Sequence, residues 1–177
     1  GSIVRAKMRS FGMHTLVVCD PYISQEPLVE MGISCAPLDE VLRRSDIVTL
    51  HVPLTDETHE MFTIDRFRLM KKTAVIINTS RGQIIRTPDL IEALKNGIIA
   101  GAGLDVLDHE PPRPDSELVG KDNVVLTPHL GWYSEEGGWD IRHMIMNDLK
   151  AFLQGKPPRY VVNPQVFQSP NLRMKPS

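Results

Sequence analysis

The chain has 177 residues, of which 41% are hydrophobic and 24% are charged, and its formal net charge is −2 at pH 7. This length and composition suit one globular domain with a hydrophobic core. The small charge and the lack of a basic stripe argue against a nucleic-acid or membrane surface, and no apolar run approaches the roughly 18 residues of a membrane span. The start shows no charged-then-apolar leader, and Cys19 and Cys35 have no CxxC spacing, so we expect a cytoplasmic protein with reduced thiols.

Short apolar runs alternate with amphipathic stretches along the chain. Five runs predict β-strands, at 16–19, 46–52, 74–77, 99–106 and 124–127. They are nearly continuous rather than alternating, which is typical of strands buried on both faces of a parallel sheet. Helical patterns occupy 38–42, 63–70, 87–97 and 134–154. This order predicts an α/β fold, with a doubly wound parallel sheet flanked by helices.

Several features refine this prediction at the ends of elements. In the helix at 87–97, Thr87 can cap the start, Pro88 fits the first turn and Gly97 can end the helix in a left-handed conformation. The last helix carries one apolar face that we expect to pack, formed by Ile141, Met144, Ile145, Leu149, Phe152 and Leu153. The loop at 107–123 is long and rich in proline, as functional or disordered loops are.

Polar residues follow the predicted strands, where open α/β sheets bind their ligands. Arg81, Glu110 and His129 form a chemical set among them. An arginine binds a carboxylate bidentately, a histidine transfers protons near neutral pH, and a carboxylate beside the histidine orients it and favours its charged form. The set predicts reduction of a 2-keto acid by hydride from a cofactor. Taken singly, each residue has an ordinary alternative: a surface ion pair, a loop histidine or a solvated carboxylate.

Asp20 follows the first predicted strand. In dinucleotide-binding folds an acid at this point accepts hydrogen bonds from the adenosine ribose and favours NAD over NADP. The alternative is an Asx-turn before Pro21. We expect no metal site, because His51 and His59 have neither zinc-ligand spacing nor suitable partners.

These motifs resemble the nucleotide-binding domain of the D-isomer-specific 2-hydroxyacid dehydrogenases. The segments that carry the resemblance are SFGMHTLVVCDPY, SDIVTLHVPLTDETHEMF, MKKTAVIINTSRGQIIRTPDLIEALKNGIIAGAGLDVLDHEPP and NVVLTPHLGW. The resemblance implies an NAD-dependent oxidoreductase that interconverts 2-keto and D-2-hydroxy acids, with Arg81, Glu110 and His129 as catalytic residues. It implies a cofactor site formed by Asp20, Pro21, His51, Pro53, Thr58, Thr79, Ser80, Asp105 and His129.

Two features depart from the family pattern. The first strand, most of the GxGxxG loop and the N-terminal substrate domain of the family are not found, and Gly1 is either the second glycine of that loop or part of an appended Gly-Ser. We therefore expect an NAD-binding Rossmann-type domain over 1–160 that is incomplete at its N-terminus and lacks its first strand, followed by a C-terminal tail over 161–177. The sequence LGWYSEE after His129 resembles the C-terminal-binding-protein branch and places Trp132 at the substrate, packing at a domain seam being the alternative.

The resemblance also implies a homodimer, with a small 2-keto or 2-hydroxy acid as the second ligand and no nucleic-acid or membrane partner. Two other hypotheses remain open. The first is an NAD(H)-sensing binding module, similar to the transcriptional corepressors of that branch. The second is an inactive fragment of the dehydrogenase. The presence of Arg81, Glu110 and His129 together favours the enzyme.

Overall fold

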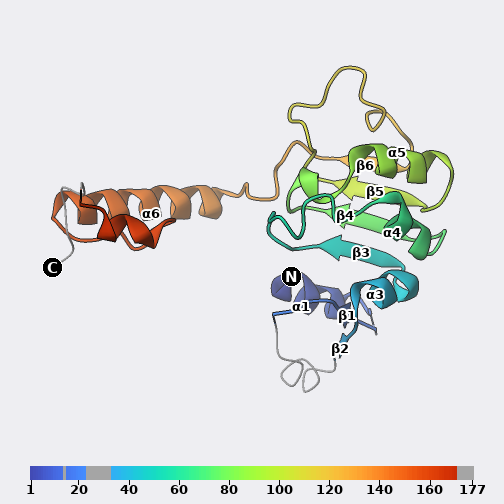
Figure 1. Cartoon of the computed structure of the whole chain (residues 1–177), viewed down its shortest axis with the longest axis horizontal. Coiled ribbons are helices and arrows are strands. Elements are labelled where there is room, and N and C mark those ends of the chain that lie inside the picture. The colour runs from blue at the N-terminus through green and yellow to red at the C-terminus, as the bar shows by residue number, and fades with distance from the viewer. Residues whose placement is uncertain (14, 23–32, 171–177) are drawn as a thin grey trace. The chain divides into compact units, whose positions relative to one another are not determined.

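The structure is a computed structural model that describes residues 1–13, 15–22 and 33–170 (Figure 1). The chain divides into two compact units, Gly1–Gly131 and Trp132–Ser177. The elements of the first unit are α1 (Ser2–Ser10), β1 (Val17–Val18), β2 (Ser34–Cys35), α3 (Leu38–Arg44), β3 (Ile47–Leu50), α4 (Ile64–Leu69), β4 (Val75–Asn78), the 3-10 helix η1 (Gly82–Ile84), α5 (Thr87–Lys95), β5 (Gly101–Leu104) and β6 (Val124–Leu126). No helix in the described part of the chain has both the length and the apolar character needed to cross a membrane.

Every strand pairing among the described residues is parallel. Strands β3, β4, β5 and β6 form a four-stranded sheet in that order, and β1 and β2 form a separate two-stranded sheet. The predicted parallel α/β fold is therefore confirmed. In a strand order of 3-2-1-4-5-6 the first strand lies at the centre. The two described sheets are separated at the position of that central strand, with β1 and β2 on one side of the gap and β3 to β6 on the other.

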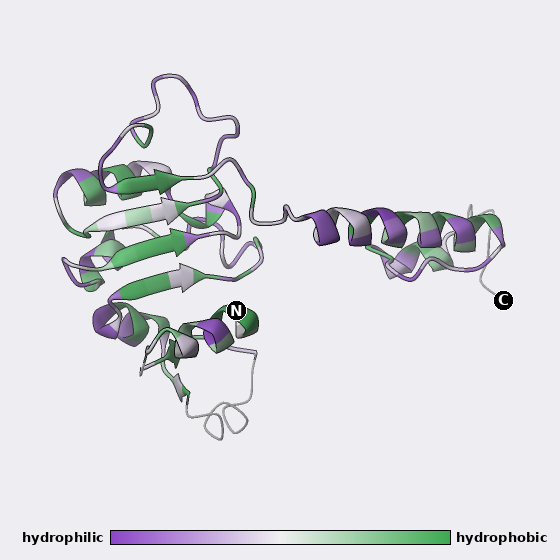
Figure 2. Cartoon of the chain, turned by 180° about the vertical axis from the view of Figure 1, so that it is seen from behind, coloured by the Kyte–Doolittle hydropathy of each residue, from purple (hydrophilic) through white to green (hydrophobic). Residues whose placement is uncertain are grey.

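The four-stranded sheet buries one of its faces and leaves the other partly exposed. Right-handed crossovers that advance in one direction place α4 and α5 on the same side, where Phe62, Phe67 and Ile76 are fully buried in the core. On the opposite face, Ile47 is 47% exposed and Val125 is 69% exposed, although Figure 2 shows β3, β4 and β6 as hydrophobic strands. The prediction of burial on both faces thus holds for one face only, because an apolar run does not reveal which elements cover it.

The ends of α5 confirm one prediction and correct another. Gly97 has a φ of +61° and follows the helix as expected. The predicted cap by Thr87 is wrong, since the N-cap residue is Arg86 and it makes no side-chain capping hydrogen bond. Asp89 links the two helices instead: its buried carboxylate accepts the Ile64 amide, the first of α4, at 2.8 Å.

The second unit contains α6 (Glu135–Leu153) and a 3-10 helix, η2 (Pro164–Gln168). The predicted start of α6 is confirmed, because the Ser134 hydroxyl caps the helix by accepting the Gly137 amide at 2.9 Å. The Asp148 carboxylate accepts the Arg159 amide at 2.8 Å and so fixes the segment after the helix. No residue of α6 is buried, so the predicted packing of its apolar face is not found in the described residues.

Candidate active site

The loops after β4 and β5 touch each other at the carboxyl edge of the sheet. A Cβ atom at Gly82 would lie 1.9 Å from the carbonyl carbon of Leu107, so only glycine permits this approach of the two backbones. Gln83 Nε2 adds a hydrogen bond to the Asp108 carbonyl oxygen at 3.4 Å. The turn that carries Arg81 therefore lies against the loop that leads to Glu110.

Glu110 in turn binds His129, which follows β6. His129 Nδ1 lies 2.7 Å from Glu110 Oε2, and Glu110 Oε1 accepts the Leu107 amide at 2.8 Å. The hydrogen bond from His129 lowers the pKa of Glu110 below its ordinary value, and the Leu107 amide lowers it further. A charged Glu110 thus holds Nδ1 and leaves Nε2 as the ring atom that can exchange a proton with a ligand.

Asp105, the residue after β5, fixes the loop around His129. Its buried carboxylate accepts the Leu130 and Gly131 amides, each at 2.8 Å, and the Thr127 hydroxyl. Burial would raise the pKa of Asp105, but these three donors outweigh it and the pKa is lowered. His129 has a φ of +53°, a left-handed conformation that a loop must impose on a non-glycine residue. Asp105 is therefore an anchor for His129, while its predicted contact with the cofactor stays a prediction.

Asn78, the last residue of β4, fixes the backbone of the turn that carries Arg81. It is fully buried, its Nδ2 donates to the Arg81 carbonyl oxygen at 2.9 Å, and its Oδ1 accepts the Ser80 amide at 3.0 Å. The Ser80 hydroxyl donates to the Leu50 carbonyl oxygen at 2.8 Å, which ties the ends of β4 and β3 together. The exposed Arg81 guanidinium donates to the Ser80 carbonyl oxygen at 2.7 Å. Sequence analysis missed this role of Asn78, although asparagine commonly bonds to the backbone two residues on.

The loops after β1 and β3 contain further predicted site residues. Asp20 Oδ1 accepts the Tyr22 amide at 2.9 Å, so the alternative Asx-turn is present and Oδ2 remains available for a ribose hydroxyl. The Thr58 hydroxyl donates to the Pro53 carbonyl oxygen at 2.7 Å and shapes the turn after β3. His51 lies beside the start of α1, since a Cβ atom at Gly1 would be 3.7 Å from His51 Cβ. Burial lowers the pKa of His51.

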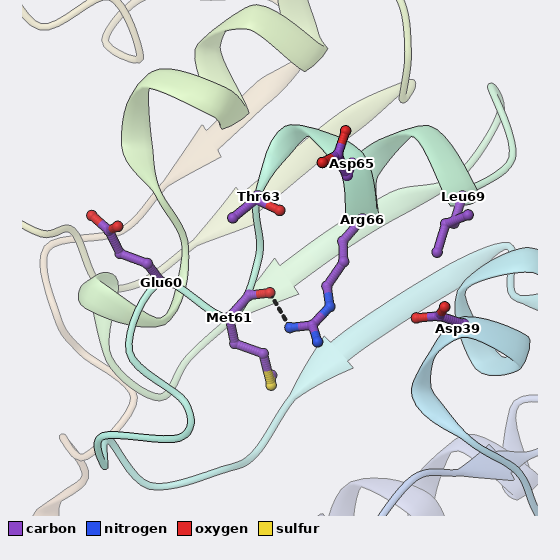
Figure 3. Close-up of a pocket in the computed structure, with 7 residues that line it drawn as sticks. All are labelled: Asp39, Glu60, Met61, Thr63, Asp65, Arg66 and Leu69. Carbon is purple, nitrogen blue, oxygen red and sulfur yellow. Dashed lines mark hydrogen bonds between the residues drawn. The ribbon is translucent and has the colours of Figure 1, made fainter.

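A pocket of about 590 Å³ has none of these predicted residues in its lining (Figure 3). It is lined by Asp39, Glu60, Met61, Thr63, Asp65, Arg66 and Leu69. The Arg66 guanidinium donates to the Met61 carbonyl oxygen. Contacts among strand-end residues, rather than this pocket, therefore define the candidate site.

Trp132 belongs to the second unit. The Trp132 ring contacts the Tyr133 ring edge-on, with the ring centroids 5.4 Å apart, and Trp132 is 57% exposed. The predicted role of Trp132 at the substrate stays a prediction.

The parallel sheet and the polar residues at its carboxyl edge define a dinucleotide-binding domain of the Rossmann type. Residues 1–131 match the family model of the D-isomer specific 2-hydroxyacid dehydrogenase, NAD binding domain. The chain belongs to this family, and NAD is its cofactor.

Named relatives agree with this family. The chain is 42% identical over 168 residues to a glyoxylate reductase of Korarchaeum cryptofilum, covering 95% of this chain and 50% of that protein. A D-lactate dehydrogenase of Aquifex aeolicus, solved with NAD and lactic acid, is similar with a TM-score of 0.80 and 36% identity, over 88% of this chain and 50% of that one. A D-3-phosphoglycerate dehydrogenase of Methanocaldococcus jannaschii is 38% identical over an alignment of 178 residues that covers 99% of this chain and 34% of that protein. The chain spans about half the length of the first two.

Proposed function

We propose that the protein containing this chain catalyses the NAD-dependent, reversible reduction of a 2-keto acid to a D-2-hydroxy acid. The observation that carries this proposal is the 2.7 Å contact between His129 Nδ1 and Glu110 Oε2, in a loop that lies against the Arg81 turn. The similarity to enzymes named for glyoxylate and lactate supports the same class of substrate. No observation favours the NAD-sensing alternative over the enzyme.

The three strand-end residues divide the chemistry among them. The Arg81 guanidinium binds the substrate carboxylate as a planar fork and so orients the keto group. His129 donates its Nε2 proton to the keto oxygen, and in the reverse direction it accepts the hydroxyl proton. Glu110 stabilises the protonated imidazole and keeps the Nδ1 proton in place. NADH supplies the hydride when it is bound.

The other strand ends would hold the two halves of the cofactor. Asp20 Oδ2 is the acceptor for the adenosine ribose, with Pro21, His51, Pro53 and Thr58 in the neighbouring turns. Thr79, Ser80 and Asp105, at the ends of β4 and β5, are the residues that we propose for the nicotinamide side. The start of α1 beside His51 suits a pyrophosphate, because amides at a helix N-terminus point toward anions.

Further features of the whole protein are also inferred from the family. We infer a homodimer in the cytoplasm, an NAD-binding domain over 1–160, and a place for Trp132 at the substrate, as in the C-terminal-binding-protein branch. Size-exclusion chromatography with light scattering of the whole protein tests the dimer. A monomer at all concentrations would contradict it.

The decisive experiment supplies the whole protein with NADH and a panel of 2-keto acids. We expect NADH oxidation, and a loss of roughly 10²–10⁴-fold in kcat/KM for His129→Ala, because general acid catalysis is removed. Arg81→Ala should lose comparable activity through the KM for the keto acid as well as kcat. His109→Ala is the matched control, since His109 is a histidine next to Glu110 in the loop after β5 and its Nδ1 contacts the Pro111 carbonyl oxygen at 2.8 Å. Tight NADH binding without turnover of any keto acid would overturn the proposal.

A further inference from the structure

A side-chain hydrogen bond joins the loops that follow β1 and β3. The Tyr22 hydroxyl donates to Glu57 Oε2 at 3.0 Å, across a separation of 35 residues. Because β1 and β3 belong to different sheets, this bond connects the two sheets at their carboxyl ends. We call these two loops the adenosine end, since Asp20 lies there.

Glu57 is held in place by the turn that contains it. Thr58 Oγ1 donates to the Pro53 carbonyl oxygen at 2.7 Å and accepts the Thr55 amide at 2.8 Å. The His59 amide donates to the Thr55 carbonyl oxygen at 2.9 Å. The Glu57 carboxylate therefore projects from a turn that is fixed from both sides.

Tyr22 contacts two carboxylates, one through its backbone and one through its side chain. Its amide donates to Asp20 Oδ1 at 2.9 Å and its hydroxyl donates to Glu57. The hydrogen bond and the charge of Glu57 raise the pKa of the Tyr22 phenol, and the charge of Asp20 raises it further. Both negative charges thus act on the same small region.

At Cys19, which precedes Asp20, the positive charge of Arg66 has a smaller effect than the negative charge of Asp20. Burial and the charge of Asp20 raise the pKa of the Cys19 thiol, and Arg66 offsets them only in part. The Arg66 guanidinium already donates to the Met61 carbonyl oxygen. The carboxylates that share its pocket are those of Asp39, Glu60 and Asp65 (Figure 3).

We propose that Glu57 is a second acidic determinant of cofactor choice, which acts with Asp20 to disfavour the 2′-phosphate of NADP. This inference rests on the proposed function, which places the adenosine ribose at Asp20. Asp20 has one oxygen engaged by Tyr22 and offers the other to the ribose. The Tyr22 hydroxyl holds the Glu57 carboxylate at the adenosine end, where its negative charge repels a 2′-phosphate on that ribose. Binding of NAD, which has no such phosphate, does not need this charge.

The test compares the dissociation constants of NADH and NADPH in the whole protein, from the fluorescence of the bound nicotinamide. Glu57→Gln removes the charge and keeps an oxygen that can accept from Tyr22. We expect it to tighten NADPH binding about tenfold, because one charge facing a phosphate at a solvated surface contributes on that order. NADH binding should change less than about twofold, and the gain for NADPH should shrink at high salt, which screens exposed charges.

Asp56→Asn is the matched control, because it removes an identical charge from the neighbouring position of the same turn. We expect it to change the preference far less, since the Tyr22 hydroxyl donates to Glu57 and fixes that carboxylate rather than Asp56. An equal gain for NADPH in Asp56→Asn and Glu57→Gln would overturn the inference, as would an equal loss of NADH and NADPH binding in Glu57→Gln. Absence of NADH binding in the unmodified protein would overturn the proposed function itself, so the two failures are distinguishable.

Discussion

The catalytic end, formed by the loops after β4, β5 and β6, is built differently from the adenosine end. Buried polar side chains hold the catalytic end: Asn78 is fully buried and Asp105 is 7% exposed. The adenosine end depends on an exposed bond, since Tyr22 is 82% exposed. A buried hydrogen bond has no water to replace it, whereas an exposed one exchanges readily with solvent. Precise positioning is therefore concentrated where we propose that the hydride and the proton are transferred.

Asp105→Ala should have the largest effect on stability. Three donors, the Thr127 hydroxyl and the Leu130 and Gly131 amides, lose their acceptor. We expect the free energy of unfolding in urea to fall by about 2–4 kcal/mol, because buried donors left without a partner cost about 1–3 kcal/mol each and the loop can partly relax. Activity of the whole protein should fall with it, since His129 loses its anchor.

Asp108→Ala is the control for that prediction. The Asp108 carboxylate accepts the adjacent His109 amide at 2.9 Å in an exposed loop. Its loss should change the free energy of unfolding by no more than about 0.5 kcal/mol, as surface substitutions usually do. Equal losses in the two variants would contradict the view that burial of Asp105 sets the precision of the catalytic end.

Asn78→Ala should come next. The Arg81 carbonyl oxygen and the Ser80 amide lose their partner in the core, which should cost about 1–3 kcal/mol in urea unfolding. The kcat of the whole protein should also fall, because Arg81 is no longer fixed. Asn96→Ala, at the exposed end of α5, removes the same amide group where no such network exists and should be close to neutral. Wild-type stability in Asn78→Ala would show that the backbone alone holds the turn.

Acid should weaken the catalytic end. The folded pKa values of Glu110 and Asp105 are both lowered, so their contributions are fully present above the ordinary carboxyl pKa and are lost as the pH falls through the lower folded values. We expect the urea midpoint to fall over that acid range. The fall should be shallower in Glu110→Gln, which cannot take part in the titration. Identical pH profiles for the two proteins would mean that the pair of Glu110 and His129 does not contribute.

The sequence could predict the catalytic end as a set but not its anchors. Arg81, Glu110 and His129 each follow an apolar run, and carboxyl ends of parallel strands meet at one edge, so their joint placement and their chemistry predicted a common site. The role of Asp105 depends on donors 22 to 26 residues away in the chain, which no local pattern reveals. Asn78 belongs to the polar motif after β4, and the tendency of asparagine to bond to the backbone two residues on is the signal that points to its role.

Other parts of the fold could not be predicted from the sequence, for different reasons. Strand β2 has two residues, too few to show a period, and it was not predicted. The exposed face of the sheet and of α6 could not be foreseen, because a period marks a face as apolar but does not supply its partner. The bond from Tyr22 to Glu57 joins two exposed loops and has no sequence signature at all.

Tyr22→Phe should have the smallest effect on the fold. The substitution keeps the ring and removes the hydroxyl that donates to Glu57, whose carboxylate then binds water instead. When it is measured beside Asn78→Ala, we expect Tyr22→Phe to show no measurable shift of the urea midpoint. The preference of the whole protein for NADH over NADPH should change only slightly, since the Glu57 charge remains. A loss of stability as large as that of Asn78→Ala would mean that the adenosine end is held as firmly as the catalytic end. The Tyr22 bond would then join the two sheets as a structural element, and the precision needed for catalysis would extend along the whole carboxyl edge.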